Sequence, residues 1–159
     1  MDKRRDLWRS IMLIALDSNI IAYAEGIGGA SRCQRASSII QALPQQSVIL
    51  PAQCLLELLY VLRRKGGKSP AEAQRIVQRW INTNRTANST AASLQTAMEI
   101  AAAHDFQIFD AFILAVATEN HCQALLSEDM QHGFKYGTVT IINPFVEPTH
   151  PMLKAYVEH

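Results

Sequence analysis

The sequence lacks any apolar run approaching the roughly 18 residues by which a membrane-spanning helix is recognised. It also has no internal repeats and no low-complexity tracts, which excludes fibrous and disordered classes of protein. The apolar segment at residues 11–16 is too short for a secretory signal, and no small-residue cleavage site follows it. We therefore expect a globular, cytoplasmic protein with no membrane partner.

Cysteine is scarce, and its three copies form no close pair. Cys33, Cys54 and Cys122 are odd in number and far apart, which indicates reduced, buried thiols rather than a disulfide framework. Three histidines also lack the spacing of paired zinc ligands, so we expect structural or surface roles for His104, His121 and His132.

Charged residues make up only 18% of the chain, and the net charge of +1 indicates no partner by itself. The charge is unevenly distributed, because residues 1–80 hold 12 Lys and Arg against 6 acids, whereas residues 81–159 hold 3 against 8. A basic cluster stands out in the first half: Arg63, Arg64, Lys65, Lys68, Arg75 and Arg79. Such a cluster suits a phosphate-contacting surface, and two solvated helix faces would explain it as well.

Alternating strands and helices are indicated by hydrophobic periodicity and by turn residues. Strands are expected at 11–16, 47–50, 123–127 and 138–142, and helices at 32–43, 51–64, 70–82, 90–104 and 110–121. Ser69 and Glu72 form a capping-box pattern around Pro70, a strong helix start. This alternation predicts an α/β fold with a parallel sheet. We expect a flexible arm at 1–10, one domain at 11–145 and an irregular tail at 146–159.

Four acids sit in separate apolar segments: Asp17, Glu57, Asp110 and Asp129. Asp17 and Asp129 each follow a predicted strand, and ligands of parallel sheets bind beyond the carboxyl ends of the strands. Two carboxylates about 4 Å apart repel by roughly 4 kcal/mol at an effective dielectric of 20, so four together require a cation. A hard divalent ion suits oxygen ligands. The alternatives are that Asp110 is a plain helix N-cap and that Glu57 is simply exposed.

The segments around these acids resemble, in order and spacing, the motifs of PIN-domain nucleases: Asp17-Ser18-Asn19, Glu57 in LLELLYVL, Asp110 in FDAFILAVA, and Ser127-Glu128-Asp129. The resemblance covers about residues 12–145 and implies a three-layer α/β/α sandwich with a mostly parallel central sheet. It implies further that the four acids hold one or two Mg²⁺ or Mn²⁺ ions. The residues implied as their support are Ser18, Asn19 and Ser127.

The activity implied by the resemblance is metal-dependent hydrolysis of RNA, with the basic cluster guiding the phosphate backbone. Small members resembling VapC toxins pair with an antitoxin, so a homodimer and an antitoxin peptide are implied as partners. A stand-alone nuclease or a nucleic-acid-binding module without useful catalysis would carry the same motifs. A phosphate-transfer domain with Asp17 as nucleophile is disfavoured, because Asn19 stands where that chemistry needs a second acid.

Aromatic residues are few, at 7% of the chain. We expect packing rather than base stacking for Trp8, Trp80 and Tyr60. Glu128 and Asp105 are expected to be exposed spare acids near the site. The predicted helix at 70–82 has more apolar residues than a small sheet covers, so we expect part of Ile76, Val77, Trp80 and Ile81 to face a partner.

Overall fold

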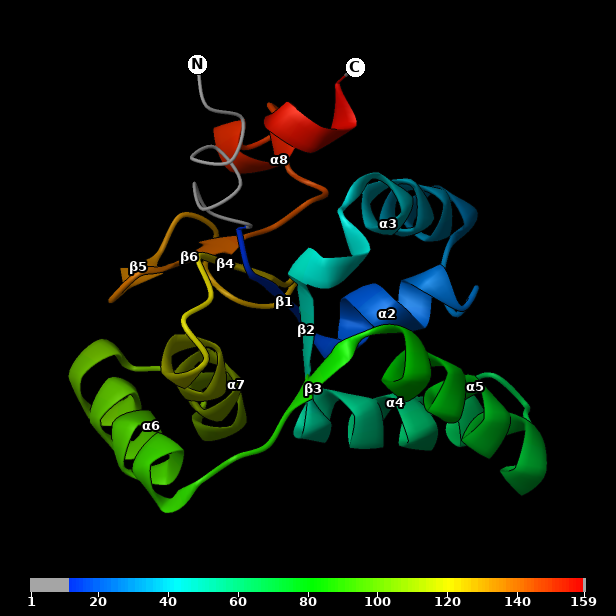
Figure 1. Cartoon of the computed structure of the whole chain (residues 1–159), viewed down its shortest axis with the longest axis horizontal. Coiled ribbons are helices and arrows are strands. Elements are labelled where there is room, and N and C mark those ends of the chain that lie inside the picture. Colours follow the sequence, from blue (N-terminus) through cyan, green and yellow to red (C-terminus); the bar gives the residue numbers. More distant parts are fainter. Residues whose placement is uncertain (1–11, 159) are drawn as a thin grey trace, which may run out of the picture.

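The central sheet has six strands in the order β3-β2-β1-β4-β6-β5, in a computed structural model that describes residues 12–158 (Figure 1). The strands are β1 (Ile14–Leu16), β2 (Val48–Pro51), β3 (Arg85–Ala87), β4 (Ala124–Leu126), β5 (Lys135–Tyr136) and β6 (Val139–Ile142). All neighbours pair in parallel except β5, which runs antiparallel to β6. The predicted mostly parallel sheet is therefore confirmed.

The register of the two central strands determines where the first and last acidic motifs emerge. Leu16 at the end of β1 lies opposite Leu126 at the end of β4, and both are fully buried. The backbone N–H of Asp17 donates to the Leu126 carbonyl at 2.9 Å. Asp17 and Ser127 therefore leave the sheet side by side, although 110 residues separate them in the chain.

Helices cover both faces of the sheet, as the predicted three-layer sandwich requires. They are α2 (Ser18–Ala24), α3 (Ala30–Ala42), α4 (Ala52–Arg64), α5 (Pro70–Thr83), α6 (Ala91–His104), α7 (Ile108–Glu119) and α8 (Pro151–Val157), with a 3₁₀ turn at Gln45–Ser47. Figure 1 shows α6 and α7 on one side of the sheet and α2 and α3 on the other. The predominantly apolar α7 lies against β2, β4 and β6, as its buried positions 111 and 113–117 indicate.

The connection between α4 and α5 is built as the sequence predicts. Ser69 accepts a hydrogen bond from the Glu72 N–H, and the Glu72 carboxylate accepts one from the Ser69 N–H, so the capping box is complete. Gly67 has a φ of +61°, which a glycine adopts without strain. A side chain at Gly66 would place its Cβ 2.8 Å from the Leu62 carbonyl oxygen. Both glycines are thus required where the chain reverses.

Some elements differ from the predictions. The tail is not irregular, because His150 caps α8 and Leu153 is buried, and α8 packs against α3. Nothing in the sequence predicted α2, β3 or β5; β3 is short and largely polar, and β5 has only two residues. The arm at 1–10, including Trp8, lies outside the described residues, as does the first residue of the predicted strand at 11–16.

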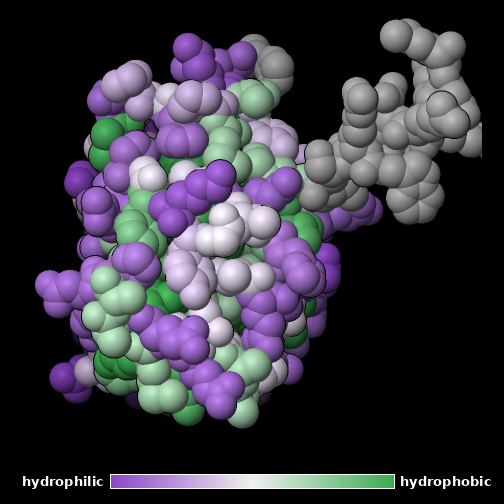
Figure 2. All heavy atoms as spheres, turned by 90° about the vertical axis from the view of Figure 1, so that its left-hand side faces the viewer, coloured by the Kyte–Doolittle hydropathy of each residue, from purple (hydrophilic) through white to green (hydrophobic). Residues whose placement is uncertain are grey.

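The remaining surface and core features agree with a small α/β domain. The three cysteines are free; Cys54 and Cys122 are buried and Cys33 is half-buried. Across residues 12–158, no helix has both the length and the apolar character needed to cross a bilayer. On the face shown in Figure 2, hydrophobic side chains are interspersed with polar ones.

Candidate acidic site

Asp17 is the buried centre of the site, with only 4% of its surface exposed. It caps α2, and its Oδ1 accepts the Ser18 N–H at 2.7 Å while its Oδ2 accepts the Ser127 hydroxyl at 2.7 Å. Burial raises the pKa of Asp17 to about 6 against the opposing effect of these hydrogen bonds, and the charges of Asp110 and Glu57 raise it further. Burial and the neighbouring charges thus disfavour the ionised form of Asp17, and its two hydrogen bonds favour it.

Ser127 joins Asp17 to the loop that follows β4. Its buried hydroxyl donates to Asp17 and accepts the N–H groups of Asp129 and Met130, each at 3.3 Å. One small side chain therefore ties the first and last acidic motifs together.

Glu57 lies half-buried on α4 and is connected to the same place through Ser18. The Ser18 hydroxyl donates to Glu57 Oε2 at 2.6 Å, and Gln53 one turn earlier on α4 donates to Oε1 at 3.2 Å. The alternative that Glu57 is simply a solvated surface residue is therefore wrong, because its carboxylate faces the residue next to Asp17.

Asp110 lies in the first turn of α7 but does not cap that helix. The cap is Gln107, whose side-chain oxygen accepts the Asp110 N–H at 3.1 Å. The carboxylate of Asp110 accepts no hydrogen bond within the described part of the chain; burial raises its pKa, and the charges of Asp129 and Glu57 contribute. The N-cap alternative for Asp110 is therefore wrong, and its charge is left available.

Asp129 is exposed, and Asn19 orients it by donating from Nδ2 to Oδ2 at 3.0 Å. Asn19 also accepts the Glu128 N–H through Oδ1, so its side-chain amide forms two hydrogen bonds with the loop that follows β4. The four acids therefore converge at the carboxyl ends of β1 and β4. A pocket of about 160 Å³ opens between Asp110 and Asp129.

The charge balance of the site is negative. Between residues 12 and 158, none of the four carboxylates forms an ion pair with a lysine or arginine. In the same range, no three acidic, histidine or cysteine side chains lie close enough together to hold one ion. The acids therefore form an open set rather than a closed ligand cage.

A family model described as the PIN domain matches residues 14–135, most of the length of the chain. The chain belongs to the PIN domain family. PIN domains form a family of nucleases, and the match therefore supports a nuclease that hydrolyses phosphodiester bonds. The family match and the four converging acids agree, since all four lie within the matched residues.

Solved structures share the PIN fold at low sequence identity. The VapC20 toxin of Mycobacterium tuberculosis, which cleaves the sarcin–ricin loop, is 22% identical over 70% of this chain and 86% of its own, with a TM-score of 0.60. A toxin–antitoxin complex from Klebsiella pneumoniae is 17% identical over 83% and 98%, with a TM-score of 0.64. DNA-bound VapBC from Salmonella typhimurium is 13% identical over 82% and 97%, with a TM-score of 0.61. No curated protein sequence matches the chain.

A divalent metal of the kind PIN nucleases use fits the donors of this site. All four acids supply hard oxygen ligands, and Asp17 and Asp110 have raised pKa values without any cationic partner among the described residues. Mg²⁺ is commonly held by one or two carboxylates together with water and substrate phosphate. The open arrangement suits such binding better than a site in which all four acids contact one ion.

The basic cluster is only partly free for a ligand. All six of its members are exposed, at the end of α4, in the turn that follows it and along α5, but Arg79 donates to Glu25 at 2.8 Å and forms an ion pair with it. Trp80 also donates to Glu25, at 2.7 Å, and is nearly buried, so its predicted packing role is confirmed. Tyr60, by contrast, is 62% exposed and does not pack in the core.

One acid was misjudged from the sequence. Glu128 is not a spare exposed carboxylate, because the Tyr23 hydroxyl and the Arg32 guanidinium both donate to it. These partners come from α2 and α3, about a hundred residues earlier in the chain, and no local pattern reveals them. Asp105, which ends α6 in a left-handed conformation, is exposed as predicted.

Proposed function

We propose that this PIN-domain protein is a Mg²⁺- or Mn²⁺-dependent ribonuclease that acts as the toxin of a toxin–antitoxin pair. The observation that carries the proposal is the buried Asp17 carboxylate, which faces the charges of Glu57 and Asp110 with no basic side chain among residues 12–158 to balance them. Similarity of fold to toxins and toxin–antitoxin complexes supports the biological role.

In this mechanism the chain's own residues position the reaction, and no serine or cysteine nucleophile is needed. A bound divalent ion supplies an activated water and neutralises charge on the phosphate. Asp17, held by Ser127 and the Ser18 N–H, would be the central ligand of that ion. Glu57, Asp110 and Asp129 would hold it directly or through water.

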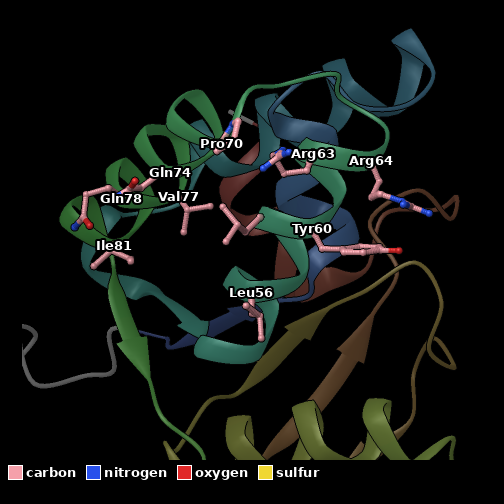
Figure 3. A pocket seen from close by; sticks show the side chains of 10 residues that line it. Leu56, Tyr60, Arg63, Arg64, Pro70, Gln74, Val77, Gln78 and Ile81 are labelled. Atoms are coloured by element: carbon pink, nitrogen blue, oxygen red, sulfur yellow. The ribbon is translucent and has the colours of Figure 1, made fainter.

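A path for single-stranded RNA runs along α4 away from the acids. Glu57, Tyr60 and Arg64 are spaced at i, i+3 and i+7, so they share one face of the helix and span roughly 10 Å. The Arg64 guanidinium lies 5.7 Å from the centre of the Tyr60 ring, and Figure 3 shows the two side chains next to each other. An exposed aromatic ring beside a cation can stack a base and contact a phosphate.

An apolar groove between α4 and α5 supports a peptide partner. It has a volume of about 690 Å³, and Figure 3 shows Val77 and Ile81 of α5 on one side and Leu56 and Tyr60 of α4 on the other. Tyr60 and Arg64, which also line the groove, share one face of α4 with Glu57, so an antitoxin segment in the groove can extend toward Glu57. Exposed apolar side chains elsewhere are suited to a homodimer: Leu94, Met98, Ile108 and Phe109.

The test of the proposed function is cleavage of single-stranded RNA by purified protein with Mn²⁺, with Mg²⁺ and with EDTA. We expect cleavage that requires the ion and that is lost in Asp17→Asn, while RNA binding is kept. Binding without cleavage under all conditions would favour the non-catalytic binding module. Cleavage indifferent to EDTA would contradict the metal mechanism.

A stand-alone nuclease is distinguished from a toxin by expression in cells. If the protein is a toxin, expression of the wild-type protein should arrest cell growth, and expression of Asp17→Asn should not. It also predicts relief of the arrest by a small protein encoded beside it. Normal growth with active enzyme would favour the stand-alone nuclease.

A further inference from the structure

Glu128 lies next to the acidic site, yet its side chain is bound by α2 and α3 and by none of the residues that hold the other four acids. Its side chain is 18% exposed, and its two oxygens are taken by different helices: Tyr23 of α2 donates to Oε2, and Arg32 of α3 donates to Oε1. Burial and the Glu128 carboxylate raise the pKa of Tyr23 to about 12, so its hydroxyl stays protonated and remains a donor. With both oxygens taken and a cation beside it, Glu128 is poorly suited to be a metal ligand.

The backbone of Glu128 is also hydrogen-bonded, through longer contacts than those of its side chain. Its N–H donates to Asn19 Oδ1, and its carbonyl accepts the Asn143 side-chain N–H, both at 3.4 Å. The residues on either side are Ser127, which donates to Asp17, and Asp129, which accepts from Asn19. A residue anchored at four points therefore lies between two members of the acidic site.

Tyr23 and Arg32 both pack against Phe145. The Tyr23 ring meets the Phe145 ring edge-on at 5.4 Å, and the Arg32 guanidinium lies 5.2 Å from the centre of that same ring. On the other side, Gly28 has a φ of +129°, and a Cβ there would lie 2.6 Å from the Tyr23 ring. Gly28 thus leaves the space that the ring occupies, and the Tyr23 hydroxyl has little freedom to leave Glu128.

We propose that Glu128 is a positioning residue that, through Tyr23 and Arg32, fixes the Ser127–Asp129 loop so that Ser127 and Asp129 face Asp17. This role rests on the proposed function, because it acts through Asp129 as a metal-binding group. It differs from the roles of the four acids, since Glu128 itself touches neither ion nor RNA. Groups that orient metal ligands typically change metal affinity or activity by about 10–100-fold when they are removed.

The first measurement is Mn²⁺ binding to RNA-free protein by titration calorimetry, which does not depend on catalysis. Glu128→Ala should weaken Mn²⁺ binding by about 10–100-fold. Tyr23→Phe, which keeps the ring packing and loses only one hydrogen bond, should weaken it by a smaller factor. In cleavage assays the same variants should need more Mn²⁺ for half-maximal rate, while the rate at saturating Mn²⁺ falls less.

A second pair of variants separates positioning from simple charge. Glu128→Gln removes a negative charge near the ion, and Arg32→Gln removes a positive one. If only the charge matters, the two changes shift Mn²⁺ affinity in opposite directions. If positioning matters, both weaken Mn²⁺ binding, because each breaks the same anchor. Tighter Mn²⁺ binding in Arg32→Gln would overturn the proposal.

The matched control is Glu119→Ala at the opposite end of α7 from Asp110. Glu119 accepts the Thr90 hydroxyl at 2.6 Å, so this variant also loses a hydrogen-bonded glutamate. It should lower Tm without changing Mn²⁺ affinity. Unchanged Mn²⁺ affinity in Glu128→Ala would overturn the positioning role alone. Wild-type protein that neither binds Mn²⁺ nor cleaves RNA would instead overturn the proposed function, and the positioning role with it.

Discussion

Replacing Asp17 by asparagine should make the protein more stable and inactive at once. Burial raises the pKa of Asp17 from 3.8 to about 6, and this shift corresponds to roughly 3 kcal/mol of unfavourable free energy for the charged folded state. Asparagine carries no charge and retains one acceptor oxygen, so the variant loses one of the two hydrogen bonds of Asp17. This loss costs about 1 kcal/mol and reduces the gain in stability by that amount. The net gain of about 2 kcal/mol raises Tm by roughly 4–8 °C in a domain of this size.

The pH dependence of this gain follows from the sign of the pKa shift. The folded state binds the Asp17 proton more tightly than the unfolded state, so wild-type stability falls as pH rises through the range from 3.8 to about 6. The full cost is present above pH 6. The Tm difference between Asp17→Asn and wild type should therefore be largest at pH 7.5 and fall to roughly a third of that value by pH 5, because the cost of the lost hydrogen bond does not change with pH.

Thermal unfolding by circular dichroism in EDTA is the direct measurement, followed by the same experiment with Mg²⁺. Ligand at 100 times its Kd stabilises a protein by about 2.7 kcal/mol, so Mg²⁺ should raise the Tm of the wild type and not that of the variant. A variant that is less stable than wild type in EDTA at pH 7.5, or that still cleaves RNA, would refute the reasoning.

Three other changes test separate parts of the structure. Neutralising Arg63 and Arg64 together should weaken RNA binding and make the plot of log affinity against log salt shallower by about 0.7 per lost contact. An unchanged slope in a salt titration would show that neither arginine contacts the RNA phosphates. Trp80→Ala removes a nearly buried indole and should cost about 3–5 kcal/mol in urea unfolding, whereas a cost below 1 kcal/mol would show that its packing is unimportant. Lysine at both Leu94 and Met98, two exposed positions of α6, should convert a dimer to a monomer in light scattering; a wild-type monomer would rule the dimer out.

Most of the fold can be predicted from the sequence, because the longer helices and the buried strands have strong local sequence signals. The capping box at Ser69 locates the start of its helix, and the apolar run before Asp17 locates the end of β1, although β1 begins three residues later than predicted. The missed elements have weak local signals: β3 reads Arg-Thr-Ala and is stabilised by pairing with β2, which no local pattern encodes. The helix α8 depends on packing against α3, which lies more than a hundred residues earlier.

The acidic site can be predicted from the sequence for a different reason. Asp17 and Asp129 each follow a buried strand, and parallel pairing of neighbouring strands brings strand ends together whatever the separation in sequence. The partners of Glu128 could not be predicted from the sequence, because only the packing of α2 and α3 brings Tyr23 and Arg32 to Glu128. Arg79 was mispredicted in the opposite sense: the sequence indicated a residue free to contact a ligand, whereas the structure has it in an ion pair with Glu25.

The central position of β1 has a consequence for biosynthesis. Its partner β4 is made about a hundred residues later, and loop closure of that length slows the final pairing. A nascent chain that ends before β4 has neither Ser127 nor Asp129, and one edge of β1 is open to incorrect pairing. The acidic site therefore cannot assemble until β4 and the loop that carries Ser127 and Asp129 have been synthesised.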